Sequence, residues 1–133
     1  MLLDVMIEKL NEDFPLLEFS TNKDKGVISI PAKNNEVGGV DIQDDTYELT
    51  VYLGKFSHWH VGSFEETINE KEKAISIAKD ISEFLNDLFN EKIILWGSSE
   101  RGGGFYHVDE KPKSKSWLNA QHKEWTWSGE KIS

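Results

Sequence analysis

Apolar residues at helical spacing mark two amphipathic segments of the chain. Between residues 2 and 11 they recur at intervals of three and four, and Pro15 follows the end of the pattern. A longer segment, about residues 66–90, repeats this spacing with charged residues on its opposite side. Ser63 and Thr67, each followed three residues later by a glutamate, form overlapping capping patterns near its start. The sequence therefore predicts an N-terminal helix and a long central helix.

Shorter segments rich in β-branched and aromatic residues predict strands. They cover residues 16–20, 26–31, 37–45, 46–54, 92–98, 104–109 and 124–129. Most of the connections are too short for parallel crossovers, so the sheet should be mainly antiparallel. The order of the elements predicts a single α+β domain over residues 1–133, with the N-terminal helix and the long central helix packed on one face. Residues 111–116 would connect this body to a tryptophan-rich C-terminal segment.

The strand at 46–54 and the segment 56–62 predict a β-hairpin. Gly54 suits the first position of a two-residue turn of type II′, which would fix the register. In that register His58 and His60 share the apolar side of the sheet, beneath the long helix. A three-residue loop would instead place both histidines beside three other residues, Glu48, Thr50 and Tyr52. We expect the two-residue loop.

The two histidines are also the candidate chemical site of the chain. Two imidazoles two residues apart on a strand can bind one metal ion when a carboxylate completes the site. His58 and His60, with Glu48 or Glu65 as third ligand or general base, would then form a metal-binding site or the centre of a hydrolase-type enzyme. No spacing specifies the third ligand, and buried hydrogen-bonded histidines are common. We therefore expect no metal or cofactor, with this site and a small-ligand pocket between helix and sheet as alternatives.

Aromatic residues are concentrated near the C-terminus, where Trp117, Trp125 and Trp127 lie within the last 17 residues. On a strand Trp125 and Trp127 would share one face, either as core residues or as an exposed aromatic patch of the kind that anchors protein interfaces. Arg101 is the only arginine beside fourteen lysines, and its guanidinium suits a bidentate contact. The glycines around Arg101 lack the spacing of phosphate-binding motifs. These three tryptophans and Arg101 form the predicted partner-binding set.

Composition favours a cytoplasmic protein. The chain contains no cysteine, which excludes disulfides, thiolate metal sites and cysteine nucleophiles. No apolar run approaches the roughly 18 residues that a membrane span requires, and the N-terminal segment is too acidic for a secretory signal. We therefore expect no membrane partner. The ratio of fourteen lysines to one arginine, with frequent asparagine and isoleucine, indicates a bacterial source.

Charge is distributed unevenly along the chain. Residues 1–110 carry 22 acidic and 10 basic residues, a net charge of −12, whereas residues 111–133 carry 2 acidic and 5 basic residues, a net charge of +3. An acidic body repels phosphate backbones and attracts basic proteins. Nucleic-acid binding is therefore disfavoured, and a basic protein partner is favoured.

These features predict non-catalytic protein binding, with an immunity, antitoxin-like or regulatory role as the specific expectation. In general character the chain resembles the small, acidic, cysteine-free, tryptophan-containing bacterial proteins that neutralise toxins by binding them. This is a likeness of type, and no family motif accompanies it. The acidic body would attract the partner, and the aromatic patch with Arg101 would anchor it. An exposed edge strand could also pair two copies into a homodimer.

Overall fold

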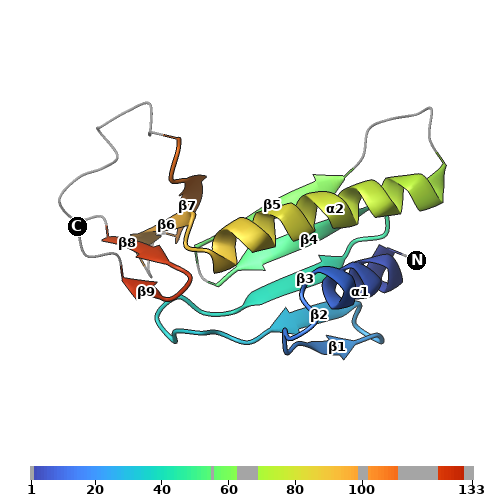
Figure 1. Ribbon diagram of the computed structural model, residues 1–133, viewed down its shortest axis with the longest axis horizontal. Coiled ribbons are helices and arrows are strands. Elements are labelled where there is room, and N and C mark those ends of the chain that lie inside the picture. The colour runs from blue at the N-terminus through green and yellow to red at the C-terminus, as the bar shows by residue number, and fades with distance from the viewer. Residues whose placement is uncertain (1, 55, 63–68, 99–101, 111–122, 131–133) are drawn as a thin grey trace.

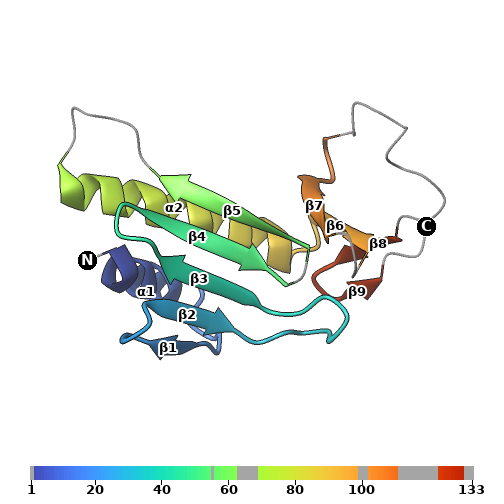
Figure 2. The same ribbon diagram turned by 180° about the vertical axis from the view of Figure 1, so that it is seen from behind.

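The computed structural model describes residues 2–54, 56–62, 69–98, 102–110 and 123–130. These residues form two helices and two antiparallel sheets (Figure 1). Both helices lie on the same face of the larger sheet, and the smaller sheet stands at one end of it (Figures 1 and 2). The predicted α+β class, with an N-terminal helix and a long central helix on one face, is confirmed. No helix in the described ranges combines the length and hydropathy that a membrane crossing requires.

The elements follow one another in the order in which they are numbered. The helices are α1, Leu2–Asp13, and α2, Glu70–Phe89. The larger sheet has the strand order β1-β2-β3-β4-β5, with β1 Ser20–Asn22, β2 Val27–Ile30, β3 Val40–Asp44, β4 Glu48–Leu53 and β5 Ser57–Gly62. The smaller sheet has the order β7-β6-β8-β9, with β6 Ile93–Ser98, β7 Gly102–His107, β8 Lys123–Thr126 and β9 Gly129–Glu130.

The predicted boundaries of α2 change at its N-terminus. Asn69 has an extended backbone, and its side-chain oxygen accepts a hydrogen bond from the backbone N–H of Glu72 at 2.8 Å, so Asn69 caps the helix. The helix therefore begins at Glu70. The capping residues predicted from the sequence, Ser63 and Thr67, lie outside the described residues.

The apolar stripes of both helices and the inner face of the sheet form the hydrophobic core. Most of its largest fully buried side chains come from α1, α2 and the three central strands of the larger sheet, and include Met6, Leu10, Ile28, Ile42, Leu49, Ile77, Ile81 and Leu85. The core continues into the smaller sheet through Ile93, Leu95, Trp125 and Trp127. One core cluster therefore holds the two sheets and both helices together.

The β4–β5 hairpin closes through three residues, so the two-residue loop predicted from the sequence is wrong. Leu53 pairs with Ser57, and the backbone N–H of Phe56 donates to the carbonyl of Leu53 at 3.0 Å. Gly54 has φ +54°, and a Cβ there would lie 2.1 Å from a neighbouring backbone oxygen, so glycine is required. Phe56 is 7% exposed and packs on Trp125 with ring centroids 4.9 Å apart. Phe56 thus belongs to the core between the sheets and not to the β4–β5 pairing.

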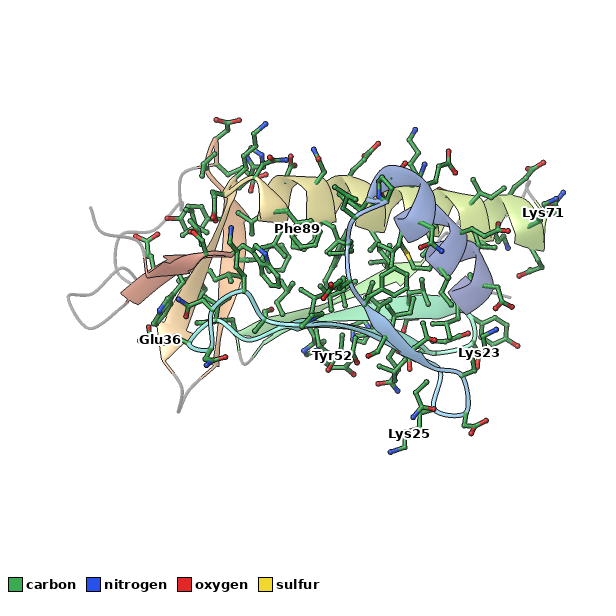
Figure 3. The ribbon with its side chains drawn as sticks, turned by 60° about the horizontal axis from the view of Figure 1, so that its bottom comes forward. Lys23, Lys25, Glu36, Tyr52, Lys71 and Phe89 are labelled. Atoms are coloured by element: carbon green, nitrogen blue, oxygen red, sulfur yellow. The ribbon has the colours of Figure 1, made fainter. Side chains whose placement is uncertain are left out.

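This register reverses the predicted faces of β5. Thr50 pairs with His60 and Tyr52 pairs with His58, on the side of the sheet away from the helices. Figure 3 shows Tyr52 pointing to that side. Trp59 points the other way and contacts α2. The expectation that both histidines lie beneath the long helix is therefore wrong, because a shift of one residue in the register moves every side chain to the opposite face.

Two other strands differ from their predicted positions. Residues 16–19 precede β1 without belonging to a strand, and Leu17 and Phe19 pack against the core within the connection from α1. The segment 124–129 is not one strand, because a turn at Trp127 and Ser128 separates β8 from β9. The hairpin predicted at 92–98 and 104–109 is present as β6 and β7.

A polar contact joins the two helices. The buried hydroxyl of Ser82 on α2 donates a hydrogen bond to the carboxylate of Asp13 at the end of α1, and the ammonium of Lys9 lies 3.3 Å from the same carboxylate. The hydrogen bond from Ser82, together with Lys9, holds the pKa of Asp13 below its ordinary value although partial desolvation opposes this. The contact therefore stabilises the fold while Asp13 is ionised.

We expect Ser82→Ala to lower the free energy of unfolding by about 1 kcal/mol at neutral pH. Because the pKa of Asp13 is lower in the folded state than in the unfolded state, its contribution is present above the unfolded pKa and is lost as the pH falls through the folded pKa. Urea titrations of both proteins at pH 7 and at steps below about pH 4 measure this. Ser76→Ala, in the same helix, controls for helix propensity. A difference that does not change with pH would contradict the prediction.

Candidate functional site

The face of the larger sheet opposite the helices is turned toward the viewer in Figure 2, and we call it the open face. Alternate residues of its three adjacent strands β3, β4 and β5 form it: Asp41, Gln43, Glu48, Thr50, Tyr52, His58 and His60. The register places Gln43, Thr50 and His60 in one row across the sheet. His58, His60 and Glu48, which the sequence analysis named as candidate site residues, therefore lie on this face.

Asp45, Glu48 and His60 approach one another around Thr50, and we call these three residues the histidine–carboxylate cluster. Nδ1 of His60 lies 3.4 Å from Oε1 of Glu48 and 3.0 Å from Oγ1 of Thr50. The hydroxyl of Thr50 donates to the carboxylate of Asp45. Each of the three residues offers one metal-ligating atom, and these atoms lie within 4.8 Å of one another. The cluster therefore combines one imidazole and two carboxylates in one small volume.

Hydrogen bonding assigns the proton on His60. Thr50 is fully buried, and its single hydroxyl proton is given to Asp45. Oγ1 of Thr50 must then accept from Nδ1 of His60, so a neutral His60 carries its proton on Nδ1. The buried hydroxyl thereby fixes the orientation of the Asp45 carboxylate and of the His60 ring.

The turn between β3 and β4 fixes the two carboxylates relative to each other. The backbone N–H of Asp45 donates to the carbonyl of Glu48 at 3.0 Å, and that of Tyr47 donates to the carbonyl of Asp45 at 2.9 Å. Between them Thr46 has φ +75°, with its N–H bonded to the side chain of Asp44 at 2.8 Å. Asp45 is thus held by the backbone as well as by Thr50.

The structure brings together part of the site predicted from the sequence. Glu48 and His60 are in contact, as the alternative metal or enzyme site requires. His58 lies beside the cluster, with its ring 5.0 Å from that of His60 and 5.9 Å from that of Tyr52, and is outside the group of three. Asp45 takes the place expected for His58. Glu65 lies outside the described residues.

A second candidate site lies on the helix side of the larger sheet, between α2, β5 and the smaller sheet. It is an open groove of about 390 Å³, and we call it the acidic groove. The rings of Trp59, Phe84 and Phe105 come from β5, α2 and β7, with centroids 5.2 Å apart for each successive pair. The remaining lining residues are Asp80, Glu83, Asp87, Ile93, Tyr106, His107 and Glu110. An aromatic floor therefore bridges the two sheets.

The groove is electronegative. Its described lining contains neither lysine nor arginine. It holds four carboxylates, those of Asp80, Glu83, Asp87 and Glu110. Nε2 of His107 lies 3.6 Å from Oδ2 of Asp87 and is the nearest compensating group when it is protonated. Helix α2 also ends here without a basic residue in its last turn, so its dipole adds partial negative charge. The groove is suited to an organic cation, whose charge would meet the carboxylates and whose carbon atoms would meet the rings.

Tyr106 fixes one wall of the groove. Its hydroxyl donates to the carboxylate of Glu124, which joins β7 to β8 across the smaller sheet. Burial, together with the neighbouring charge of Glu124, raises the pKa of Tyr106 to about 12. The phenol is therefore neutral over the physiological range and stays a hydrogen-bond donor.

The structure places two of the four predicted partner-binding residues in the core. Trp125 and Trp127 are 9% and 7% exposed, which agrees with the core interpretation of these rings. The indole N–H of Trp125 donates to Glu36 at 3.2 Å, and Trp127 packs on Phe89 with centroids 5.3 Å apart. Trp117 and Arg101 lie outside the described residues.

The glycine-rich stretch beside Arg101 has a packing role where the structure describes it. A Cβ on Gly103 would lie 1.8 Å from the carbonyl oxygen of Trp96, and one on Gly104 would lie 2.8 Å from its indole. Both glycines are in β7 and are paired with β6. They therefore allow the close approach of the Trp96 side chain and backbone to β7.

Comparison of the chain with known protein families, with characterised proteins and with solved structures finds no match in any of the three.

Trp125→Ala should lower the free energy of unfolding by about 3–5 kcal/mol, because it removes a buried ring at the junction of the two sheets. Urea unfolding followed by far-ultraviolet circular dichroism measures the change. Tyr47→Ala is the matched aromatic control, since Tyr47 is 84% exposed and should cost no more than about 0.5 kcal/mol. Equal effects of the two substitutions would contradict a core position for Trp125.

Proposed function

We propose that the protein acts by non-catalytic binding of a basic protein partner, with the acidic groove as the central contact. The observation that carries this proposal is the aromatic floor beneath four carboxylates, in a described lining without lysine or arginine. A lysine or arginine side chain of the partner would lie along the rings of Trp59 and Phe84 and direct its charge to Asp80 and Glu83.

The size of the groove supports a contact of this kind. A volume of about 390 Å³ accommodates one or two side chains, which is the scale of an interface hot spot and smaller than a whole interface. The acidic residues of the chain would steer a basic partner toward the groove before contact. An immunity, antitoxin-like or regulatory role in the bacterial cytoplasm is the specific form of this proposal.

The first test compares two variants with equal changes in net charge. Asp80→Asn combined with Glu83→Gln removes two charges from the groove, and Glu8→Gln combined with Asp24→Asn removes two exposed charges from α1 and the β1–β2 turn. Each tagged protein is used to capture partners from lysates of the source organism at low and at moderate salt, with mass spectrometry of the retained proteins.

We expect one basic protein to be retained near one to one by the wild type and by the control variant, with less retained at moderate salt. The groove variant should bind the purified partner at least tenfold more weakly, equivalent to about 1.4 kcal/mol. Equal weakening by both double variants would show that overall charge and not the groove is responsible. Capture of no protein by the wild type would contradict the proposal for the growth conditions used.

The aromatic floor is tested separately by Phe84→Leu. Leucine keeps most of the buried volume of this half-buried residue, so the free energy of unfolding should fall by less than about 1.5 kcal/mol. Loss of the ring face that contacts Trp59 and Phe105 should nevertheless weaken binding of the purified partner several-fold. Unchanged affinity, measured by calorimetry on a folded variant, would remove the rings from the proposed contact.

A further inference from the structure

We propose that Asp45, Glu48 and His60 bind a divalent transition-metal ion, for which Zn²⁺ is the natural probe. The three residues lie on the open face of the larger sheet, opposite the helix side on which the acidic groove lies. The proposal therefore does not depend on the proposed protein-binding function. It assigns a role to the part of the open face where imidazole and carboxylate groups are closest.

The donor set selects the class of ion. An imidazole nitrogen favours zinc, copper, nickel or iron, whereas calcium and magnesium prefer all-oxygen sites with more ligands. Zinc bonds to nitrogen and oxygen are about 2.0–2.2 Å long, so two ligands of a tetrahedral ion lie about 3.3–3.5 Å apart. Nδ1 of His60 and Oε1 of Glu48 are 3.4 Å apart, which matches one edge of such a tetrahedron. A carboxylate oxygen of Asp45 lies within 4.8 Å of both ligand atoms and would supply the third corner.

The charge of the cluster favours a cation. Two carboxylates that approach this closely repel each other, and in the described part of the chain no salt bridge joins either of them to a lysine or arginine. His60 is their compensating partner when it is protonated. A divalent ion would neutralise both carboxylates at once.

Thr50 supports the cluster in the way that outer hydrogen bonds support metal ligands. It is fully buried although it lies on the open face, and its hydroxyl contacts both Asp45 and His60. Hydrogen bonds of this kind orient metal ligands and strengthen metal binding. The hydrogen bond to Asp45 orients that ligand before the ion arrives, whereas the contact with Nδ1 of His60 would be replaced by the ion.

Binding would change the tautomer of His60. Nδ1 of neutral His60 carries the proton in the metal-free protein, so coordination through Nδ1 requires that proton to be carried on Nε2 instead, with no net loss of a proton. The His60 side chain is 53% exposed, so water can occupy the remaining coordination position. Three protein ligands and one water form the arrangement of zinc sites that keep an open position.

The experiment titrates untagged, full-length protein that has been treated with a chelator. Calorimetry follows Zn²⁺ binding, and visible absorption follows Co²⁺, whose spectrum reports coordination number. We expect one ion per chain, with binding abolished by His60→Gln or Asp45→Asn. Thr50→Val keeps the buried shape and should weaken binding about tenfold. His58→Gln and His107→Gln should leave the affinity within about twofold of the wild type, since neither residue is in the cluster.

Circular dichroism and urea unfolding show which variants are folded, and the Zn²⁺ affinity is compared among the folded variants only. The exposed His60 and the half-buried Glu48 lie outside the hydrophobic core, so their substitution tests the site without disturbing that core. Absence of Zn²⁺ binding by the wild type, or binding that His60→Gln and Glu48→Gln leave unchanged, would overturn the proposal. The variant Asp80→Asn with Glu83→Gln should bind Zn²⁺ as the wild type does, so failure of the metal site and failure of the groove are distinguishable.

Discussion

Phe56 leaves the β4–β5 pairing and packs against Trp125 of the smaller sheet, and the placement of both candidate sites depends on this contact. With Phe56 in the core, β5 begins at Ser57 and the hairpin closes through three residues. Trp59 then points to the helix side, and His60 points to the open face. Had Phe56 paired with Leu53 in a two-residue turn, these two side chains would exchange faces, and neither the aromatic floor nor the histidine–carboxylate cluster would form.

Helix α2 packs against both sheets and so helps to fix their relative positions. Its buried stripe packs on the larger sheet, while Phe84 contacts Trp59 of β5 and Phe105 of β7. At the end of the helix Phe89 contacts Trp127. A backbone hydrogen bond of 2.9 Å from the N–H of Gly103 to the carbonyl of Phe56 adds a polar link between the sheets. The groove is therefore the solvent-facing side of the aromatic packing that joins the two sheets.

Local pattern predicted the helices, the α+β class and the β6–β7 hairpin, because each depends on residues close in sequence. The register of β5 was not predictable in this way, since the length of its loop depends on a contact between residues 56 and 125. A three-residue loop was nevertheless the stated alternative. The cap at Asn69 was not predicted, although Asn69 and Glu72 have the spacing of a capping pattern, because Ser63 and Thr67 offer the same spacing earlier in the segment.

The remaining site residues were missed because they come from several elements. Asp45 lies in a polar turn, where a carboxylate is ordinarily solvated, and only the β4–β5 register brings His60 to it. The groove combines residues of β5, α2 and β7, which share no sequence pattern. Trp125 and Trp127 had a core position as one of their two interpretations, and their burial agrees with it.

The two proposed sites, on opposite sides of the larger sheet, would offer negative charge to different kinds of cation. In the groove the carboxylates lie beside aromatic rings. Such rings favour a polarisable organic cation that is weakly hydrated, because its desolvation costs little free energy. In the cluster the carboxylates lie beside an imidazole and a buried hydroxyl, which offer a nitrogen and oxygen atoms at short distances. A small ion that bonds directly to nitrogen and oxygen gains more there than a guanidinium would. The chemistry beside each carboxylate, and not the charge alone, therefore distinguishes the two sites.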